Sequence, residues 1–260
     1  CDADSAGVQV GDEAVLTIKG DSSRTYGMQV RCEPGVELTL DNARIDNGNS
    51  AHALSFSGDD NTLTFIGDIM VRSGSDRAGM KVGNGGKLTI YGDPDKEYRD
   101  THILCEPGVT LKLRDVYLSR HDVYEHILSF LGDDNTLLLE GDTSLESDGD
   151  FSNIFAGVHA ADGASLTIIG QSDNACKHIT VACEPGADLT LRDVHIDNSD
   201  QDNTLALSFT GDGTHPSALT LKGDNALKSS RNGYAGVRVG NTADLTIQGN
   251  GTLTVFGGDT

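Results

Sequence analysis

The sequence predicts an all-β fold, a single-stranded, right-handed parallel β-helix (β-solenoid) of about ten coils. Two observations predict it. A motif of alternating apolar and polar residues recurs ten times at intervals of 22 to 30 residues, and such alternation is typical of a strand with one buried face. The segments between the copies are rich in Gly, Asp, Asn and Ser, which tolerate tight turns, and they show no helical periodicity. The leucines that open the motif are Leu16, Leu38, Leu63, Leu88, Leu111, Leu137, Leu166, Leu189, Leu219 and Leu245.

The recurrence of one motif in one register favours a solenoid over an antiparallel sandwich or barrel. Hairpin folds predict alternating, unlike strands, whereas the coils of a solenoid repeat one another. Coils that stack at about 4.8 Å give a rod of about 48 Å, and a right-handed crossover is the default between parallel strands. We therefore expect the leucines to form one continuous internal ladder along the rod.

The coils are of three kinds that follow one another in a fixed order. The second kind begins with Cys-Glu-Pro-Gly, and the third begins with Gly-Asp-Asp-Asn-Thr-Leu or an altered copy of it. This cycle predicts a single domain over 1–260, with superrepeats at approximately 7–82, 83–160 and 161–239 and a partial coil at 240–260. Because neither end carries a polar or helical cap, we expect a monomeric fragment of a longer repeat protein, with end-to-end stacking of rods as the alternative.

Cys32, Cys105 and Cys183 occupy the same position in successive superrepeats. Three coils separate neighbouring members by about 14 Å, about twice the Cα separation in a disulfide, so we expect small buried residues rather than disulfides. Cys1 and Cys176 have no counterpart in the repeat, and the cysteine spacing argues against a zinc site or a disulfide scaffold. The Pro-Gly that follows each repeated cysteine presets the turn that opens the coil.

The chain is strongly acidic, with 19 Lys and Arg against 40 Asp and Glu, for a net charge of −21. This charge disfavours nucleic acid and anionic lipid, which need a Lys/Arg face. It favours divalent cations and cationic partners, or simply keeps a surface protein soluble. No apolar stretch is long enough to span a membrane and no signal peptide lies within the sequence. Cys1 could be the acylated first residue of a lipoprotein or only the point at which this sequence begins.

Two Gly-Asp-Asp-Asn-Thr-Leu turns, three coils apart, are the candidate metal sites. Carboxylate and amide oxygens suit a hard cation such as calcium, but a full site needs about six to eight of them and one turn supplies about three or four. We therefore expect weak calcium binding at most, and the alternative is Asx side chains that satisfy their own backbone. The candidate ligands are Asp59, Asp60, Asn61, Asp133, Asp134 and Asn135.

The densest group of titratable residues surrounds His121, Asp122 and Tyr124. This segment is one residue longer than its counterpart in the first superrepeat, so we expect it to bulge from the coil. Such residues could bind a sugar or move a proton, and a solvated loop is the alternative. His126 aligns with His52 and with a leucine in the third superrepeat, which favours a packed role for this position.

Segments such as GKLTIYGD, AGVRVGNTADLTI and ADLTIQGNGTLTVFGG resemble secreted repeat proteins of gut and cellulolytic Gram-positive bacteria. Those proteins are described as carbohydrate-binding-domain or adhesin-like β-helices, and they are pectate-lyase-like in shape. The resemblance covers nearly all of the chain. It implies secretion or a place on the bacterial cell surface, with polysaccharide or host glycan as the partner and calcium as a possible cofactor.

Three functions remain open. The first is a non-catalytic, adhesin-like surface protein that binds carbohydrate, and the second is a structural stalk. The third is a polysaccharide lyase or hydrolase, for which an Arg-Asp column at Arg114 and Arg192 is the nearest candidate, although Asp41 breaks the column. Trp is absent, but Tyr91, Tyr117 or Tyr124 could stack on a sugar. Fold alone does not choose among these functions.

Overall fold

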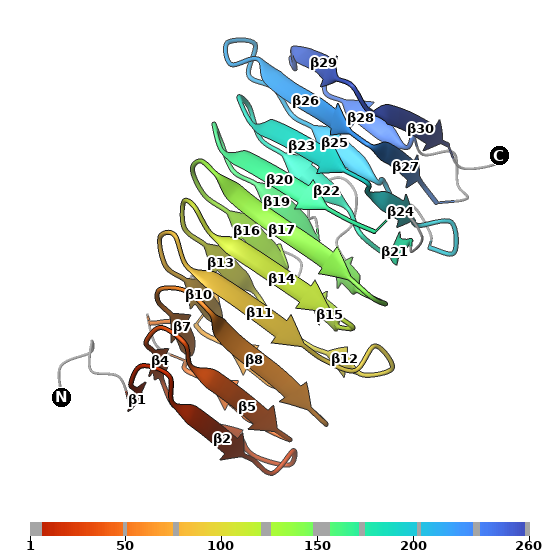
Figure 1. Ribbon diagram of the computed structural model, residues 1–260. Helices are drawn as coiled ribbons and strands as arrows, with labels where there is room; N and C mark the ends of the chain where they lie inside the picture. Colours follow the sequence, from red (N-terminus) through yellow and green to blue (C-terminus); the bar gives the residue numbers. More distant parts are fainter. Residues whose placement is uncertain are drawn as a thin grey trace.

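The computed structural model describes residues 7–48, 51–74, 78–120, 126–147, 157–171, 175–201, 204–230 and 235–257. Every secondary-structure element in these segments is a β-strand, and every pairing between strands is parallel. The chain winds as a solenoid whose coils stack from the N-terminal to the C-terminal end (Figure 1), so the predicted parallel β-helix is confirmed.

Each coil contributes one strand to each of three faces. The first sheet and the second sheet each contain ten strands, whereas the third face is divided into sheets of three and seven strands. In the first sheet the strands are β1 (Val8–Val10), β4 (Val30–Cys32), β7 (Leu54–Phe56), β10 (Met80–Val82), β13 (Ile103–Cys105), β16 (Leu128–Phe130), β19 (Val158–Ala160), β22 (Val181–Cys183), β25 (Leu207–Phe209) and β28 (Val237–Val239). In the second sheet they are β2 (Val15–Lys19), β5 (Glu37–Asp41), β8 (Asn61–Ile66), β11 (Lys87–Tyr91), β14 (Thr110–Arg114), β17 (Asn135–Glu140), β20 (Ser165–Ile169), β23 (Asp188–Arg192), β26 (Ser217–Lys222) and β29 (Leu245–Gly249). On the third face they are β3 (Thr25–Tyr26), β6 (Arg44–Asp46), β9 (Met70–Arg72), β12 (Glu97–Tyr98), β15 (Tyr117–Arg120), β18 (Ser144–Ser147), β21 (Cys176–Lys177), β24 (His195–Asp197), β27 (Asp224–Lys228) and β30 (Thr252–Phe256).

The core is a narrow stack of apolar columns inside the coils. In the first sheet, Cys32 lies between Val10 and Phe56, and Cys105 lies between Val82 and Phe130 in the same way. The four cysteines in the described segments are free and buried, as expected for the three that belong to the repeat. Burial raises the pKa of the Cys32 thiol to about 12, which keeps the thiol protonated.

The Cys-Glu-Pro-Gly motif joins neighbouring coils through its backbone. The Pro34 carbonyl accepts the Glu13 N–H at 2.9 Å, and the Gly35 N–H donates to the Asp59 carbonyl at 2.9 Å. Gly35 has φ +74°, a conformation that only glycine adopts without strain. The predicted turn role of the motif is therefore confirmed.

The prediction of one continuous leucine ladder is wrong, because the ladder is interrupted after every third coil. Leu38 pairs with Leu63 as predicted, but Leu88 pairs with Asn61, and Leu63 faces Ile90. The same two-residue shift places Leu166 opposite Asn135 and Leu245 opposite Ser217. A shift of two preserves the alternation of inward and outward side chains, so the core tolerates it.

The third face was not predicted from the sequence. Most of its strands have two to four residues, and these alternate too briefly to stand out from turns. Met70 and Arg99 form an isolated parallel bridge between its two sheets. The described part of the chain contains no helix long and apolar enough to cross a membrane.

Candidate functional site

A continuous column of side chains crosses the third face on its outer surface. The strand alternation buries Leu118, Leu145 and Ile196 and turns one residue next to each of them outward. Because the strands are in register, these outward residues lie side by side across six successive coils. They are Glu97, Tyr117, Ser144, Lys177, Asp197 and Lys228.

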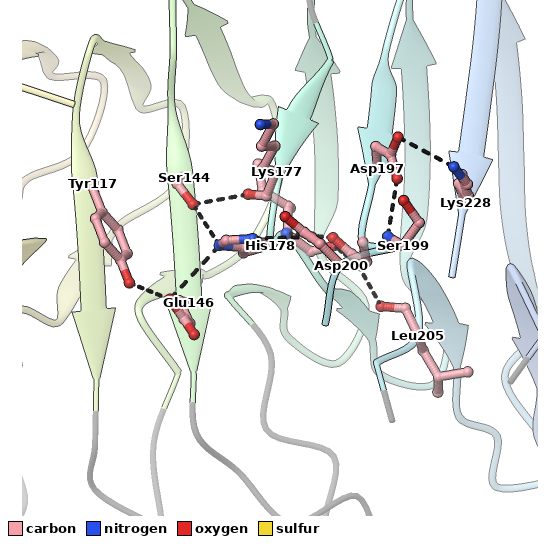
Figure 2. A network of polar contacts seen from close by, with 12 residues as sticks. Tyr117, Ser144, Glu146, Lys177, His178, Asp197, Ser199, Asp200, Leu205 and Lys228 are labelled. Carbon is pink, nitrogen blue, oxygen red and sulfur yellow. Dashed lines mark hydrogen bonds and ion pairs between the residues drawn. The ribbon is translucent and has the colours of Figure 1, made fainter. Parts of the chain in front are cut away.

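A polar network links four coils at the middle of this column (Figure 2). The Tyr117 hydroxyl donates a hydrogen bond to Oε2 of Glu146, and the same carboxylate oxygen lies 3.7 Å from Nδ1 of His178. On the other side of the ring, Nε2 of His178 lies 3.2 Å from Oδ1 of Asp200. The Ser144 hydroxyl also contributes, with Oγ 3.3 Å from Nδ1 of His178. His178 therefore joins two carboxylates, one from each of the coils on either side of its own.

The backbone holds His178 in an unusual conformation. Its φ is +57°, in the left-handed region, and Asp100 has φ +54° at the equivalent point of the preceding superrepeat. The next residue, Ile179, is fixed by Asn198, whose buried amide accepts the Ile179 N–H at 3.0 Å and donates to its carbonyl at 2.9 Å. The strained turn is thus held in place from both sides, and strain of this kind is often associated with functional sites.

Charge is balanced at one end of the column, between Asp197 and Lys228. Partial burial alone would raise the pKa of Asp197, but hydrogen bonds from Ser199 and the nearby Lys228 outweigh it and lower the pKa. Nζ of Lys228 lies 3.5 Å from Oδ2 of Asp197. Asp197 is therefore ionised at neutral pH.

A hollow of about 320 Å³ opens beside this network. It combines one aromatic ring, two hydroxyls, two carboxylates, an ammonium and an imidazole, a mixture that can contact both the apolar and the hydroxylated parts of a small ligand. Its lining residues are Pro94, Asp95, Tyr117, Asp142, Thr143, Ser144, Ala175, Lys177 and His178.

Two other hollows, of about 510 and 520 Å³, each contain a cation that is paired with a carboxylate. In the first, Nζ of Lys81 lies 2.5 Å from Oε1 of Glu106. In the second, Arg99 lies 2.6 Å from Glu97. The smaller hollow offers a partly exposed aromatic ring, that of Tyr117, which favours it as a binding site.

The asparagines of the two acidic turns lie inside the coil. Asn61 is buried, its Oδ1 accepts the Val36 N–H at 3.2 Å, and its Nδ2 donates to the Ser57 carbonyl at 2.8 Å. Asn135 makes the equivalent contacts with Val109 and Leu131. The amide oxygens predicted as calcium ligands are therefore committed to backbone donors, because each turn needs an internal partner for its buried peptide groups.

The aspartates of these turns remain exposed. Oδ2 of Asp59 lies 2.9 Å from Nζ of Lys87, and Asp60 and Asp134 adopt positive φ in the turns. Ser165 takes the place of Lys87 at the second turn, where its Oγ accepts the Asp134 N–H at 2.7 Å. Among the described residues, no group of three or more His, Cys, Asp and Glu side chains is placed to hold a metal ion. Calcium binding by Asp59, Asp60, Asp133 and Asp134 stays a prediction.

The aspartates of the Arg-Asp column are turn residues. Asp115 and Asp193 have φ +52°, and their Oδ1 atoms accept the N–H groups of Asp142 and Asp224 at 3.1 and 3.2 Å. Asn42 makes the same contact with Asp68 at 3.2 Å. The side chains of this column link successive turns. In the first superrepeat the amide of Asn42 makes the link that an aspartate makes in the other two.

The structure describes only part of the site that was predicted from the sequence. His121, Asp122 and Tyr124 lie outside the described residues. Tyr117 was a candidate for sugar stacking and does line the hollow, whereas Glu146 and His178 were missed. One signal in the sequence could have identified His178: it stands at the position where the previous superrepeat has Asp100.

Comparison of the chain with known protein families, with characterised proteins and with solved structures finds no match. Both nitrogens of the His178 ring face protein groups within 3.7 Å, so the ring is suited to holding its neighbours in place. The ring and hydroxyls around the hollow are suited to binding.

Proposed function

We propose that this chain is a non-catalytic, adhesin-like solenoid of the bacterial surface or the extracellular space, and that it binds carbohydrate in the hollow beside Tyr117. The observation that supports this most directly is that the Tyr117 ring lines a hollow of about 320 Å³ together with Ser144, Thr143 and Asp142. An aromatic face can pack on the C–H surface of a sugar while hydroxyls and carboxylates bind its hydroxyl groups.

The volume of the hollow suits a short segment of a glycan, because it lies at the lower end of the range for small-ligand pockets. The charge of the chain limits which glycans it can bind. With a net charge of −21, the molecule repels acidic polymers unless a divalent cation bridges the two. Neutral and amino sugars are therefore the expected ligands without metal, and acidic sugars would require calcium.

The test is a glycan array followed by calorimetry, run once with millimolar calcium and once with a chelator. Tyr117→Ala should weaken binding about fivefold, since an aromatic contact is worth about 1 kcal/mol. Tyr91→Ala is the matched control, because Tyr91 is an outward tyrosine of the second sheet and does not line the hollow.

The outcomes separate the alternatives. Binding that is lost in Tyr117→Ala and kept in Tyr91→Ala supports the proposal. Binding that disappears with the chelator and in Asp134→Asn points instead to a metal-bridged site at the acidic turns. No binding under either condition overturns carbohydrate recognition and leaves a stalk as the better function.

A further inference from the structure

A second cluster of titratable side chains lies on the outer surface of the first sheet, and the proposed function does not use it. The rings of His126 and His159 are stacked, with centroids 3.9 Å apart and planes at 10°. Nε2 of His102 lies 3.1 Å from Oγ of Ser129, which pairs with His159 in the sheet. Three histidines from three successive coils therefore meet at one place, and the His159 side chain is only 13% exposed.

His159 belongs to a contact that is repeated in every superrepeat. Nε2 of His159 lies 3.1 Å from Oε1 of Glu184, the glutamate of a Cys-Glu-Pro-Gly motif. At the equivalent points, Gln9 donates to Glu33 at 3.3 Å and Lys81 lies 2.5 Å from Glu106. The chain thus fills one structural position with an uncharged amide, a permanent cation and a group that titrates near neutral pH.

The surroundings of His159 favour its neutral form. Burial lowers its pKa, Glu184 opposes this, and the nearby His102 lowers it further. Nε2 lies close to Glu184 but without the alignment of a good hydrogen bond. Among the described residues, Glu184, His102 and His126 are the titratable groups against which this ring lies.

We propose that His102, His126 and His159 form a proton-sensitive latch that holds β16 and β19 together at neutral pH and loosens this part of the first sheet on acidification. Two parallel neutral rings stack favourably, whereas two protonated rings at 3.9 Å repel each other. Stacked rings do not direct their nitrogens at a common point, and this distinguishes the cluster from a metal site.

The direction of the pH dependence follows from linkage. A histidine whose pKa is lower in the closed state than the free value of about 6.5 binds more protons when the structure opens. The closed state is therefore fully stabilised above about pH 6.5 and loses stability as the pH falls below it.

Hydrogen exchange tests the latch at two backbone amides beside it. The Leu128 N–H donates to the Gly157 carbonyl and the Val158 N–H to the Thr180 carbonyl, both at 2.9 Å. After correction for intrinsic chemistry, their protection should fall between pH 7.5 and 5.5 by up to about tenfold, because pH 5.5 lies one unit below the free pKa of histidine. His159→Gln should abolish this fall, because Gln9 shows that an amide satisfies the same position.

Two further measurements keep the proposal testable if His159→Gln proves unstable. His215→Gln is the matched control, since His215 is exposed and lies outside the cluster, and it should leave the exchange of Leu128 unchanged. NMR titration of the wild-type histidines needs no variant. A His159 midpoint at or above 6.5, or an equal loss of protection in His159→Gln, would overturn the latch.

Discussion

Asn61 of β8 lies directly opposite Leu88 of β11, so a buried amide occupies the place where the repeat predicts a leucine. The contact marks the junction between two superrepeats, and Asn135 opposite Leu166 marks the next. Each asparagine supplies an internal partner to a turn that would otherwise bury unpaired peptide groups. The cost is a two-residue shift of register, which the alternating core absorbs.

This relationship predicts that Asn61→Leu destabilises the protein although it places an apolar side chain in an apolar column. The Val36 N–H and the Ser57 carbonyl would both lose their partner, and we expect a loss of about 2–3 kcal/mol. Urea unfolding measures it. Asn84→Ala, at an exposed turn position, is the control and should change stability by less than about 0.5 kcal/mol. Equal stability of Asn61→Leu and wild type would show that the amide is not needed.

The sequence predicted the solenoid because its signal is repeated ten times, so errors in single coils did not matter. It did not reveal the register shift, since moving a strand by two residues leaves the pattern of apolar and polar positions unchanged. Strands as short as β21 carry too few residues for any periodicity to show. The network around His178 was not predicted from the sequence for a different reason. Tyr117 and Glu146 are 29 residues apart, and only the stacking of coils brings them together.

The buried cysteines should be almost inert in the folded protein. Burial raises the pKa of Cys32 to about 12 and that of Cys176 to about 11, and it raises the pKa values of Cys105 and Cys183 as well. At pH 8 very little thiolate forms, so a thiol reagent should react more than about a hundredfold slower than with a free cysteine. The measurement is the absorbance change with an aromatic disulfide in a Cys1→Ser background, before and after denaturation. Rapid reaction of any of the four thiols without denaturant would contradict their burial in solution.

The pKa of His215 should be shifted in the opposite direction from that of His159. Its Nδ1 lies 2.7 Å from Oδ2 of Asp212, and this hydrogen bond raises the pKa of His215. Backbone hydrogen bonds from Thr214 and His215 hold the pKa of Asp212 well below its usual range. The interaction is thus present below pH 6.5 and is lost as the pH rises through the raised value. NMR should show His215 titrating above about 6.5 in the wild type and near 6.5 in Asp212→Asn. An identical midpoint in both proteins would show that the pair is not formed.

Tyr117 and His178 should be energetically coupled, because both contact the same carboxylate of Glu146. Tyr117→Phe keeps the ring but removes the hydroxyl, and His178→Asn keeps a residue that tolerates the left-handed backbone. Removing either partner leaves Glu146 less firmly held, so the second removal costs less than the first. In a double-mutant cycle measured by denaturant unfolding, we expect a coupling of about 0.5–1 kcal/mol, which should vanish in a Glu146→Gln background. Lys228→Ala is the control partner for Tyr117→Phe, since Lys228 pairs with Asp197 and not with Glu146, and those two effects should add. Additive effects of Tyr117→Phe and His178→Asn would mean that the shared contact does not hold the network together.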